Sequence, residues 1–245
     1  MLLSTTLLVI TVVFLASLVR ATFGFGEAVV GMPLLALLPL DLHTAISLIG
    51  LAGLTVAVLA TATGWRHVDR PALLRLAAAT AVGIPVGLGL VTLAPAAVVT
   101  AALGAFLVGY GGYSLIRPAL PRITAPTWAL PFGFAAGMLG SAYNLNGVPV
   151  VVYGSLYRWN PETFRNTLQA HFLVSGVFVV AGQALGGLWA PPLLSLYGLA
   201  VPAIVAATVL GTIVHKHIPA ERFQQSVYAV VLVLGALLLL TSFRG

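Results

Sequence analysis

The chain of 245 residues contains no cysteine and very little charge, with Asp, Glu, Lys and Arg making up 7% of it. The absence of cysteine excludes disulfides, thiolate metal sites and cysteine nucleophiles. The shortage of charge excludes a soluble domain, because a folded surface in water needs far more charged side chains. Instead, 60% of the residues are hydrophobic and the mean hydropathy is +1.09. We therefore expect an integral membrane protein.

The hydrophobic runs are long enough for membrane-spanning helices, and nothing shows the ten-residue alternation of a β-barrel. We therefore predict an all-α polytopic membrane protein. Residues 1–19 lack the basic start and small-residue cleavage site of a signal peptide and are interpreted as mature structure. The net charge of +6 would suggest nucleic acid in a soluble protein. Here the preference of Lys and Arg for one side of a membrane accounts for it, and no nucleic-acid partner is expected.

Two hydrophobic segments are broken by polar and helix-breaking residues. The first, RATFGFGEAVVGMP at 20–33, contains an arginine, a glutamate and three glycines. The second, GSAYNLNGVP, covers 140–149. The landmarks Gly31-x-Pro33 and Gly147-x-Pro149 lie 147 − 31 = 116 residues apart, close to half the chain. Matching breaks in two hydrophobic halves point to the binding site of a transporter.

The chain divides into two predicted repeats, each with one broken segment and three spans. Residues 1–122 form the first, with a broken segment at 1–40 and spans at about 44–63, 76–94 and 96–116. Residues 123–245 form the second, with a broken segment at 125–157 and spans at about 161–188, 193–214 and 223–242. Asp41 is expected to cap the span at about 44–63. Asn160, Pro161 and Glu162 form a typical helix start.

The distribution of Lys and Arg decides whether the broken segments cross the membrane. Apart from 1–19, their arms are shorter than the roughly 30 Å hydrocarbon core. If both segments cross, the chain has eight spans and the basic residues divide between the two faces. If both are re-entrant hairpins, nine of the ten Lys and Arg other than Arg20 lie on one face, which the positive-inside rule favours. This arrangement makes two inverted repeats with hairpin tips that meet near the midplane and both termini outside. Eight spans is the alternative.

Arg20 and Glu27 are the sharpest functional signal, because a charge at the bilayer centre costs about 2.5–3.5 kcal/mol on insertion scales. One interpretation is that they pair with each other and only stabilise the hairpin tip. The other is that Arg20 binds an anionic substrate, while Glu27 pairs with it or carries a coupling proton. Helices starting at Gly26 and at Gly147 would add backbone N–H groups and positive dipole ends to an anion site.

The second half supplies further polar candidates. Tyr143, Asn144 and Asn146 at the second tip would bind substrate, satisfy the backbone of the broken helix, or do both. Gln169 and His171 lie about 14–16 Å along the helix that begins at 160, near the midplane. The histidine would relay a proton or bind an oxyanion, or else be a buried neutral side chain bonded to a carbonyl.

The chain shows no arrangement typical of an enzyme or a metal protein. His215 and His217 flank Lys216 in a predicted basic loop without a carboxylate cluster, so we interpret them as solvated side chains. No nucleophile–base pair, Walker loop or metal-ligand spacing is found, and no cofactor is expected. Without a nucleotide site, the energy for transport would come from gradients.

The segment RATFGFGEAVVGMPLL, together with the later GVP and FRNTL, resembles the TauE/SafE family of sulfite and organosulfonate exporters. The resemblance covers essentially the full length in two repeats. It implies transport of sulfite, sulfoacetate or related sulfonates across the bacterial inner membrane, in the direction of export. Glu27 stands where the family motif often has a further glycine or an aromatic residue, which would place a proton carrier beside the site.

The residues and the resemblance together predict a secondary transporter for a small sulfur-containing anion, working by alternating access between the hairpin tips. The expected substrate-binding residues are Arg20, Gly24, Phe25, Gly26, Gly31, Tyr143, Asn144, Asn146, Gly147 and Gln169. Glu27 and His171 are the candidates for proton coupling. The expected partners are the anion, protons and the lipid bilayer, with a homodimer left open. The alternatives are an anion channel, a transporter of another small organic anion, and a non-transporting membrane scaffold.

Overall fold

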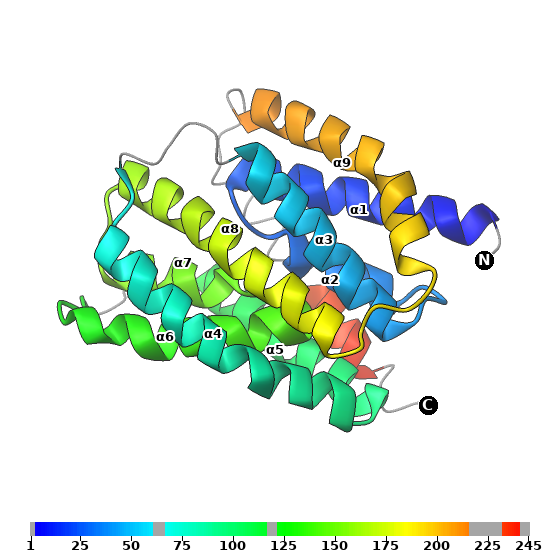
Figure 1. Ribbon diagram of the computed structural model, residues 1–245, viewed down its shortest axis with the longest axis horizontal. Coiled ribbons are helices and arrows are strands. Elements are labelled where there is room, and N and C mark those ends of the chain that lie inside the picture. The colour runs from blue at the N-terminus through cyan, green and yellow to red at the C-terminus, as the bar shows by residue number, and fades with distance from the viewer. Residues whose placement is uncertain (1–2, 61–66, 117–121, 216–231, 241–245) are drawn as a thin grey trace.

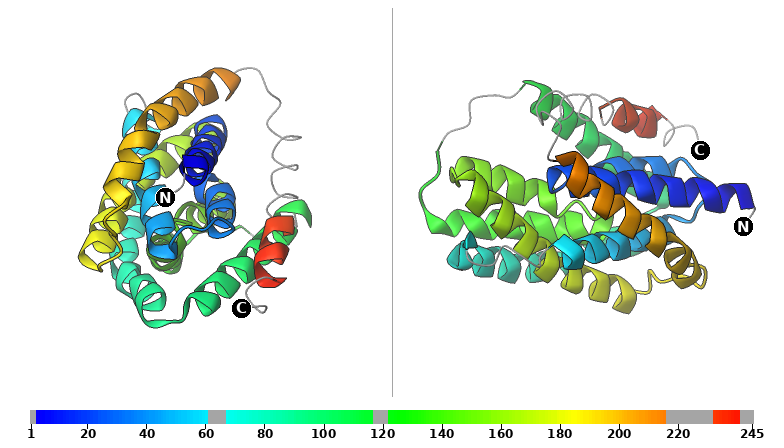
Figure 2. Two further views of the ribbon diagram at one scale, coloured as in Figure 1. Left: turned by 90° about the vertical axis from the view of Figure 1, so that its right-hand side faces the viewer. Right: turned by 90° about the horizontal axis from the view of Figure 1, so that it is seen from above.

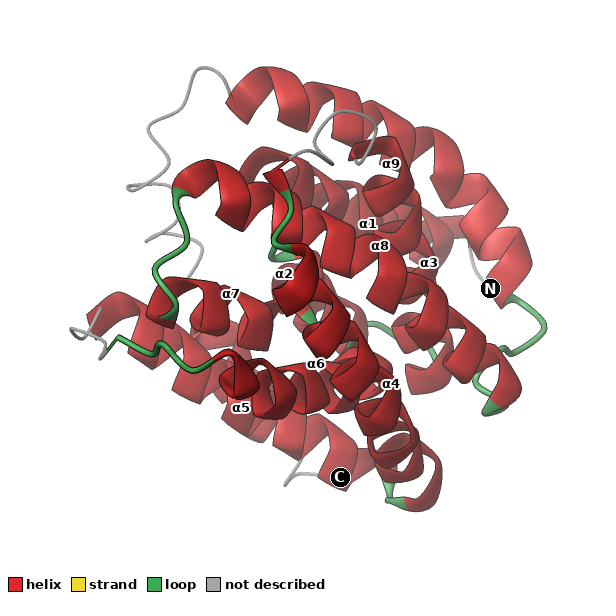
Figure 3. Ribbon diagram, turned by 60° about the vertical axis from the view of Figure 1, so that its left-hand side comes forward, coloured by secondary structure: helices red, strands yellow, loops and turns green. Residues whose placement is uncertain are grey.

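The computed structural model describes residues 3–60, 67–116, 122–215 and 232–240. Every regular element in these ranges is helical, which confirms the predicted all-α class (Figure 3). Six of the described helices are long and apolar enough to cross a membrane, and two further apolar helices are shorter. Large apolar side chains such as Leu74, Val82 and Val209 are exposed on the outer helix faces. This is the surface expected of a multi-pass membrane protein, whose outer side chains face lipid.

The described residues of the first half form the helices α1 to α5, and the second half repeats their order. The first five are α1 (Leu3–Phe23), α2 (Glu27–Ala36), α3 (Leu42–Ala60), α4 (Arg70–Leu93) and α5 (Ala96–Ile116). After the short 3-10 turn η3 (Pro126–Trp128) come α6 (Ala129–Tyr143), α7 (Gly147–Leu156), α8 (Pro161–Leu185) and α9 (Leu193–His215). Residues 232–240 are helical, while the remainder of the predicted 223–242 span and His217 lie outside the described residues.

Side-chain caps set several helix starts. Asp41 Oδ2 accepts a hydrogen bond from the Thr44 N–H at 2.9 Å, and Asn160 Oδ1 accepts one from Thr163 at 2.8 Å, which confirms both predicted caps. The predicted start of the 76–94 span was wrong, because α4 begins at Arg70. Asp69 caps this helix, and Pro71 lies in its first turn, where proline is favoured. Residues 70–75 of the predicted basic loop at 66–75 are therefore helical.

The two broken segments are helical hairpins that enter the bundle from opposite ends. Figure 1 shows α1 entering from the right-hand end and α2 turning back towards that end, whereas α6 enters from the left-hand end and α7 turns back towards it. Residues of both tips line the same hollows, so the tips meet inside the molecule. The helices α4 and α8 begin, and α7 ends, at the left-hand end (Figure 1). Basic residues at these helix ends, such as Arg70 and Arg158, therefore gather at one end of the bundle, as the hairpin arrangement requires.

Glycines let α4 and α6 pack with their backbones almost in contact. A Cβ added at Gly83 or Gly87 of α4 would lie within 3 Å of a carbonyl oxygen of α6. A Cβ at Gly133 or Gly137 of α6 would meet carbonyl oxygens of α4 in the same way. Two small-x3-small patterns therefore face each other, the packing that membrane helices use in place of large apolar side chains.

The same relation recurs between α9 and α1. A Cβ added at Gly211 of α9 would lie 2.5 Å from Ala21 Cβ and 3.0 Å from the Leu18 carbonyl oxygen of α1. The first arm of each hairpin thus packs against a helix from the other half of the chain. In the end-on view of Figure 2, α1 and α2 lie inside, while α4, α5 and α9 lie towards the outside. Both hairpins are held in place by outer helices, which positions their tips.

In the structure, equivalent positions of the two hairpins lie 120 residues apart in the sequence. The second arms begin at Glu27 and Gly147, which are 147 − 27 = 120 residues apart. The left-handed residues Gly24 and Asn144 of the two tips are also 144 − 24 = 120 residues apart. The predicted 116-residue spacing was wrong, because Gly31 lies inside α2 whereas Gly147 begins α7.

Candidate functional site

Arg20 and Glu27 form a buried ion pair at the first hairpin tip. Arg20 lies in the last turn of α1 and Glu27 begins α2, and the chain reverses between them through Gly24 (φ 83°) and Gly26 (φ 99°). Glycine adopts these left-handed conformations without a steric penalty. Arg20 Nη1 lies 2.8 Å from Glu27 Oε2, with the side chains only 8% and 5% exposed. Ser17 Oγ donates to the second carboxylate oxygen at 3.5 Å.

The Arg20 guanidinium keeps donors beyond those that Glu27 uses. Nε and Nη2 are buried and have no hydrogen-bond partner in the part of the chain that the structure describes. These two nitrogens lie on one edge of the planar group, a geometry that binds two oxygens of one oxyanion. Buried donors of this kind are normally satisfied. The free edge is therefore suited to an anionic ligand.

Two glycines of α3 make room for the polar tips. A Cβ added at Gly53 would lie 2.7 Å from Glu27 Oε2 and 2.8 Å from Arg20 Nη1. A Cβ added at Gly50, almost one turn earlier, would lie 2.7 Å from Gln183 Oε1 and 2.9 Å from Asn144 Oδ1. The helix that faces both tips thus lacks side chains where their polar groups lie.

Asparagines hold the second hairpin tip in place. Asn144 ends α6 in a left-handed conformation (φ 57°), and its amide donates to the Ile46 carbonyl of α3. Its Oδ1 accepts a hydrogen bond from Gln183 Nε2 at 3.3 Å. Asn146 Nδ2 donates to Ser175 Oγ of α8 at 2.8 Å. Both asparagines therefore stabilise the broken segment while presenting amide groups at the place where the tips meet.

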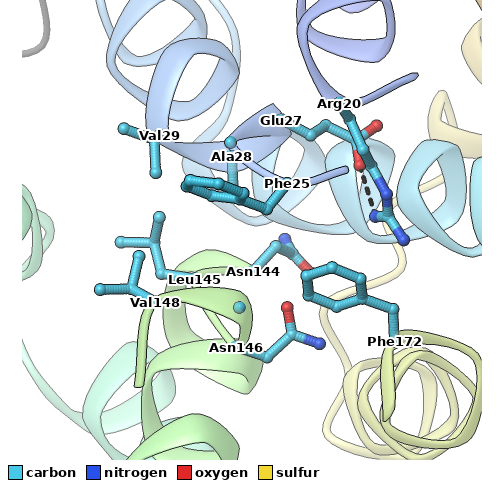
Figure 4. Close-up of a pocket in the computed structure, with 12 residues that line it drawn as sticks. Arg20, Phe25, Glu27, Ala28, Val29, Asn144, Leu145, Asn146, Val148 and Phe172 are labelled. Atoms are coloured by element: carbon cyan, nitrogen blue, oxygen red, sulfur yellow. Dashed lines mark hydrogen bonds and ion pairs between the residues drawn. The ribbon is translucent and has the colours of Figure 1, made fainter. Parts of the chain in front are cut away.

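Two small hollows lie where the tips meet, and they share a wall formed by Arg20, Glu27, Asn144, Asn146 and Phe172. The first hollow is also lined by the N-terminal residues of α2 and α7 (Figure 4), and the second by residues of α3 and α8. Each has a volume of about 20 Å³, which is space for one water molecule. The polar groups therefore surround spaces that have room for a water molecule but not for an oxyanion.

A family model described as Sulfite exporter TauE/SafE matches residues 9–238, which include both hairpin tips and the residues of both hollows. The chain belongs to the TauE/SafE family. This confirms the resemblance inferred from the motifs at the two tips and makes the protein a membrane transporter of the sulfite-exporter type. No curated protein and no solved structure matches the chain.

Most of the predicted site residues of this TauE/SafE protein lie together. Those that line a hollow are Arg20, Phe25, Gly26, Glu27, Asn144, Asn146 and Gly147. Two others join α8 to the first tip, since Gln169 Nε2 donates to the Gly24 carbonyl oxygen at 2.9 Å. Gln169 Oε1 is buried and has no partner among the described residues. Gln169 therefore stabilises the turn of the first hairpin tip from α8.

Three predicted site residues lie elsewhere and line neither hollow. The Tyr143 hydroxyl donates to the Val99 carbonyl of α5 at 2.9 Å. Gly31 faces α1 and α3, where an added Cβ would meet their side chains, so it serves close packing. His171 Nε2 lies 3.1 Å from Thr80 Oγ1 of α4, and the histidine is fully buried. Since Thr80 Oγ1 donates to the Gly133 carbonyl, it accepts from the imidazole.

Several residues at the site were not predicted from the sequence. They are Ser17, Gly50, Gly53, Phe172, Ser175 and Gln183. Helical spacing offered a signal for three of them, because Ser17 lies three residues before Arg20 and Phe172 three residues after Gln169. Gln183 follows Gln169 by fourteen residues, which returns to nearly the same helix face. The glycines gave no such signal, since glycine is common throughout this chain.

Proposed function

We propose that this TauE/SafE protein moves sulfite or a related small sulfur oxyanion across the bacterial inner membrane, in the direction of export. The observation that carries the proposal is the free, buried edge of the Arg20 guanidinium, formed by Nε and Nη2. Glu27 occupies only Nη1, so the remaining edge is open to two oxygens of one oxyanion. The family supports the class of substrate.

The two hairpin tips supply further groups for an anion. The helices α2 and α7 begin at Glu27 and Gly147, and their first residues line the first hollow. The first N–H groups of a helix have no partner within it, and its dipole is positive at this end. An anion between the tips therefore meets two helix N-termini together with the Asn144 and Asn146 amides.

Glu27 is the proton carrier in this proposal. Its carboxylate lies in the wall of both hollows and neutralises Arg20. A proton on Glu27 removes that neutralisation and leaves Arg20 with a full positive charge for the substrate. Anion and proton thus bind together and cross in the same direction, so the outward gradient of the anion drives export and carries the proton with it. His171 is not part of this step, because it lies against Thr80 and outside both hollows.

The placement of the hairpins supports a mechanism of alternating access. They enter from opposite ends of the bundle, as in an inverted repeat made of 1–122 and 123–245 (Figure 1). The hollows are too small for the substrate, so binding requires the tips to separate. Rocking of one repeat against the other would open the site to each side in turn. The positive-inside rule places the basic end of the bundle in the cytoplasm and the termini outside.

The experiment is uptake into proteoliposomes of sulfite, a panel of sulfonates and a panel of carboxylates, with and without a pH gradient. Wild type is compared with Arg20→Ala and with Arg75→Ala, which removes an exposed arginine of α4. We expect saturable sulfite flux that only Arg20→Ala abolishes. We also expect counterflow, in which unlabelled sulfite inside drives labelled sulfite to accumulate. Flux without saturation or counterflow indicates a channel, and flux of no anion contradicts the proposal.

A further inference from the structure

Phe172 lies at the centre of the site although it carries no polar group. Its ring is in the shared wall of both hollows and is buried, with an exposure of 4%. The Arg20 guanidinium carbon lies 4.5 Å from the ring centroid, within range of a cation–π interaction. Figure 4 shows the ring of Phe172 next to Arg20, Asn144 and Asn146.

The outer edge of the ring, at Cζ and Cε1, lies against the start of α7. A Cβ added at Gly147 would lie 2.6 Å from Phe172 Cζ. No side chain larger than hydrogen therefore fits at this position while the ring keeps its place. Phe172 thus touches both Arg20 and the N-terminus of α7, the two groups that hold the same anion in the proposed mechanism.

We propose that Phe172 determines the size of the anion that the site accepts, an inference that rests on the proposed function. The ring occupies the space into which a substituent of the anion would extend. Sulfite consists of one sulfur and three oxygens, so it needs only a small movement of the tips. An organosulfonate carries a carbon substituent in addition, and this group requires the volume that the ring fills. The chain therefore selects the inorganic oxyanion over organosulfonates.

Removal of the ring has a specific consequence. Because Phe172 lines both hollows, a smaller side chain at 172 joins them into one cavity beside Arg20. The walls of this cavity include apolar residues, Val29 and Val148 among them, that suit a short carbon chain. The polar groups that hold the oxygens stay in place. Transport of sulfonates should therefore become more efficient relative to transport of sulfite.

The test measures kcat/KM for sulfite and for ethanesulfonate in proteoliposomes containing wild type, Phe172→Leu, Phe172→Ala or Phe178→Ala. Phe178 is an exposed phenylalanine of the same helix that lines neither hollow. We expect the ratio of kcat/KM for ethanesulfonate to kcat/KM for sulfite to rise at least about tenfold in Phe172→Ala, to rise less in Phe172→Leu, and to stay unchanged in Phe178→Ala. The loss of the cation–π contact weakens both substrates alike, so it does not change this ratio.

Gly147→Ala tests the position of the Phe172 ring in a second, independent way. Its methyl group displaces Phe172, so we expect sulfite transport to fall. We expect Phe172→Ala to restore transport in the Gly147→Ala background, because the obstructing ring is gone. A double variant that is worse than either single one would show that Gly147→Ala does not act through the ring.

The outcomes separate this inference from the function on which it rests. One outcome is that wild type transports sulfite in an Arg20-dependent way, but the substrate ratio of Phe172→Leu and of Phe172→Ala equals that of wild type. Phe172 then does not set the size of the anion, and only this inference fails. If wild type transports neither anion, the proposed function fails with it. Thermal stabilisation of the detergent-purified variants by each anion gives the ratio of the two binding affinities without reconstitution.

Discussion

Arg20 binds Glu27 through a single guanidinium nitrogen at 2.8 Å and leaves the Nε–Nη2 edge without a partner in the described chain. A pair that served only to neutralise two buried charges would gain most by using two nitrogens of the fork. The single contact satisfies the carboxylate while a bidentate edge stays buried and free. This geometry lets one side chain take part both in the ion pair and in the proposed substrate site.

Replacement of Arg20 by lysine should lower sulfite affinity by about 10- to 100-fold, although the positive charge is kept. Lysine is a point charge without the planar fork, so it loses the bidentate contact and the stacking on Phe172. The change is measured as KM for saturable sulfite uptake, with Arg75→Lys as the control. Equal affinity in Arg20→Lys and wild type would show that the fork is not used.

Glu27→Gln should separate transport from its driving force. The amide keeps the shape of the carboxylate but carries no proton in exchange, so sulfite counterflow should continue while a pH gradient no longer drives accumulation. The measurement compares the two modes in the same vesicles, with Glu27→Asp as a variant that keeps the titratable group. Accumulation that still follows the pH gradient in Glu27→Gln would remove this residue from the coupling step.

His171→Asn should reduce stability without changing the response to a pH gradient. The histidine is fully buried and bonded to Thr80, so its loss leaves the threonine hydroxyl without its donor and costs about 1–3 kcal/mol. Thermal unfolding in detergent measures the first effect, and gradient-driven sulfite uptake the second. A stable His171→Asn protein that has lost the pH response would make His171, and not Glu27, the proton carrier.

Gly53→Ala should impair transport by about tenfold or more while the protein still folds. The new methyl group lies within 3 Å of both Glu27 Oε2 and Arg20 Nη1, so the ion pair has to move. Gly198→Ala is the matched control, because an added Cβ there meets nothing within 4 Å. Transport and thermal stability are measured for both variants. Wild-type transport by Gly53→Ala would show that the position of the pair is not critical.

Gly137→Ala should destabilise the protein by about 1–3 kcal/mol, since its Cβ would be forced against the Thr80 carbonyl in the α4–α6 contact. Gly89→Ala, in α4 itself, has open space around the new methyl group and should be neutral. Thermal unfolding in detergent distinguishes the two. Equal stability would mean that α4 and α6 separate at little cost, and that their glycines do not fix the second hairpin.

The sequence predicted the fold well where local chemistry decides it. Hydrophobic length and breaks marked the spans and both hairpins, and the caps at Asp41 and Asn160 lie where side-chain chemistry predicts them. The start of α4 was missed because the cap at Asp69 lies within a run of basic residues that suggested a loop.

The site was predicted only in part, since tertiary packing decides which face of a helix meets the tips. Arg20, Glu27 and Asn146 followed from their position in the breaks. Tyr143 and His171 are polar residues at the expected depth, but their helices turn them towards other partners. The roles of Gly53 and Phe172 depend on contacts between α3, α8 and the tips, which no local pattern specifies.

The most direct test of the central claim is calorimetric binding of sulfite to the purified protein in wild type, Arg20→Gln and Arg75→Gln form. We predict saturable binding with one site per chain in wild type and Arg75→Gln, and none in Arg20→Gln, whose fold is verified by thermal unfolding. Wild-type affinity for sulfite in a folded Arg20→Gln protein would contradict the account, because binding of the anion would then not depend on the Arg20 guanidinium.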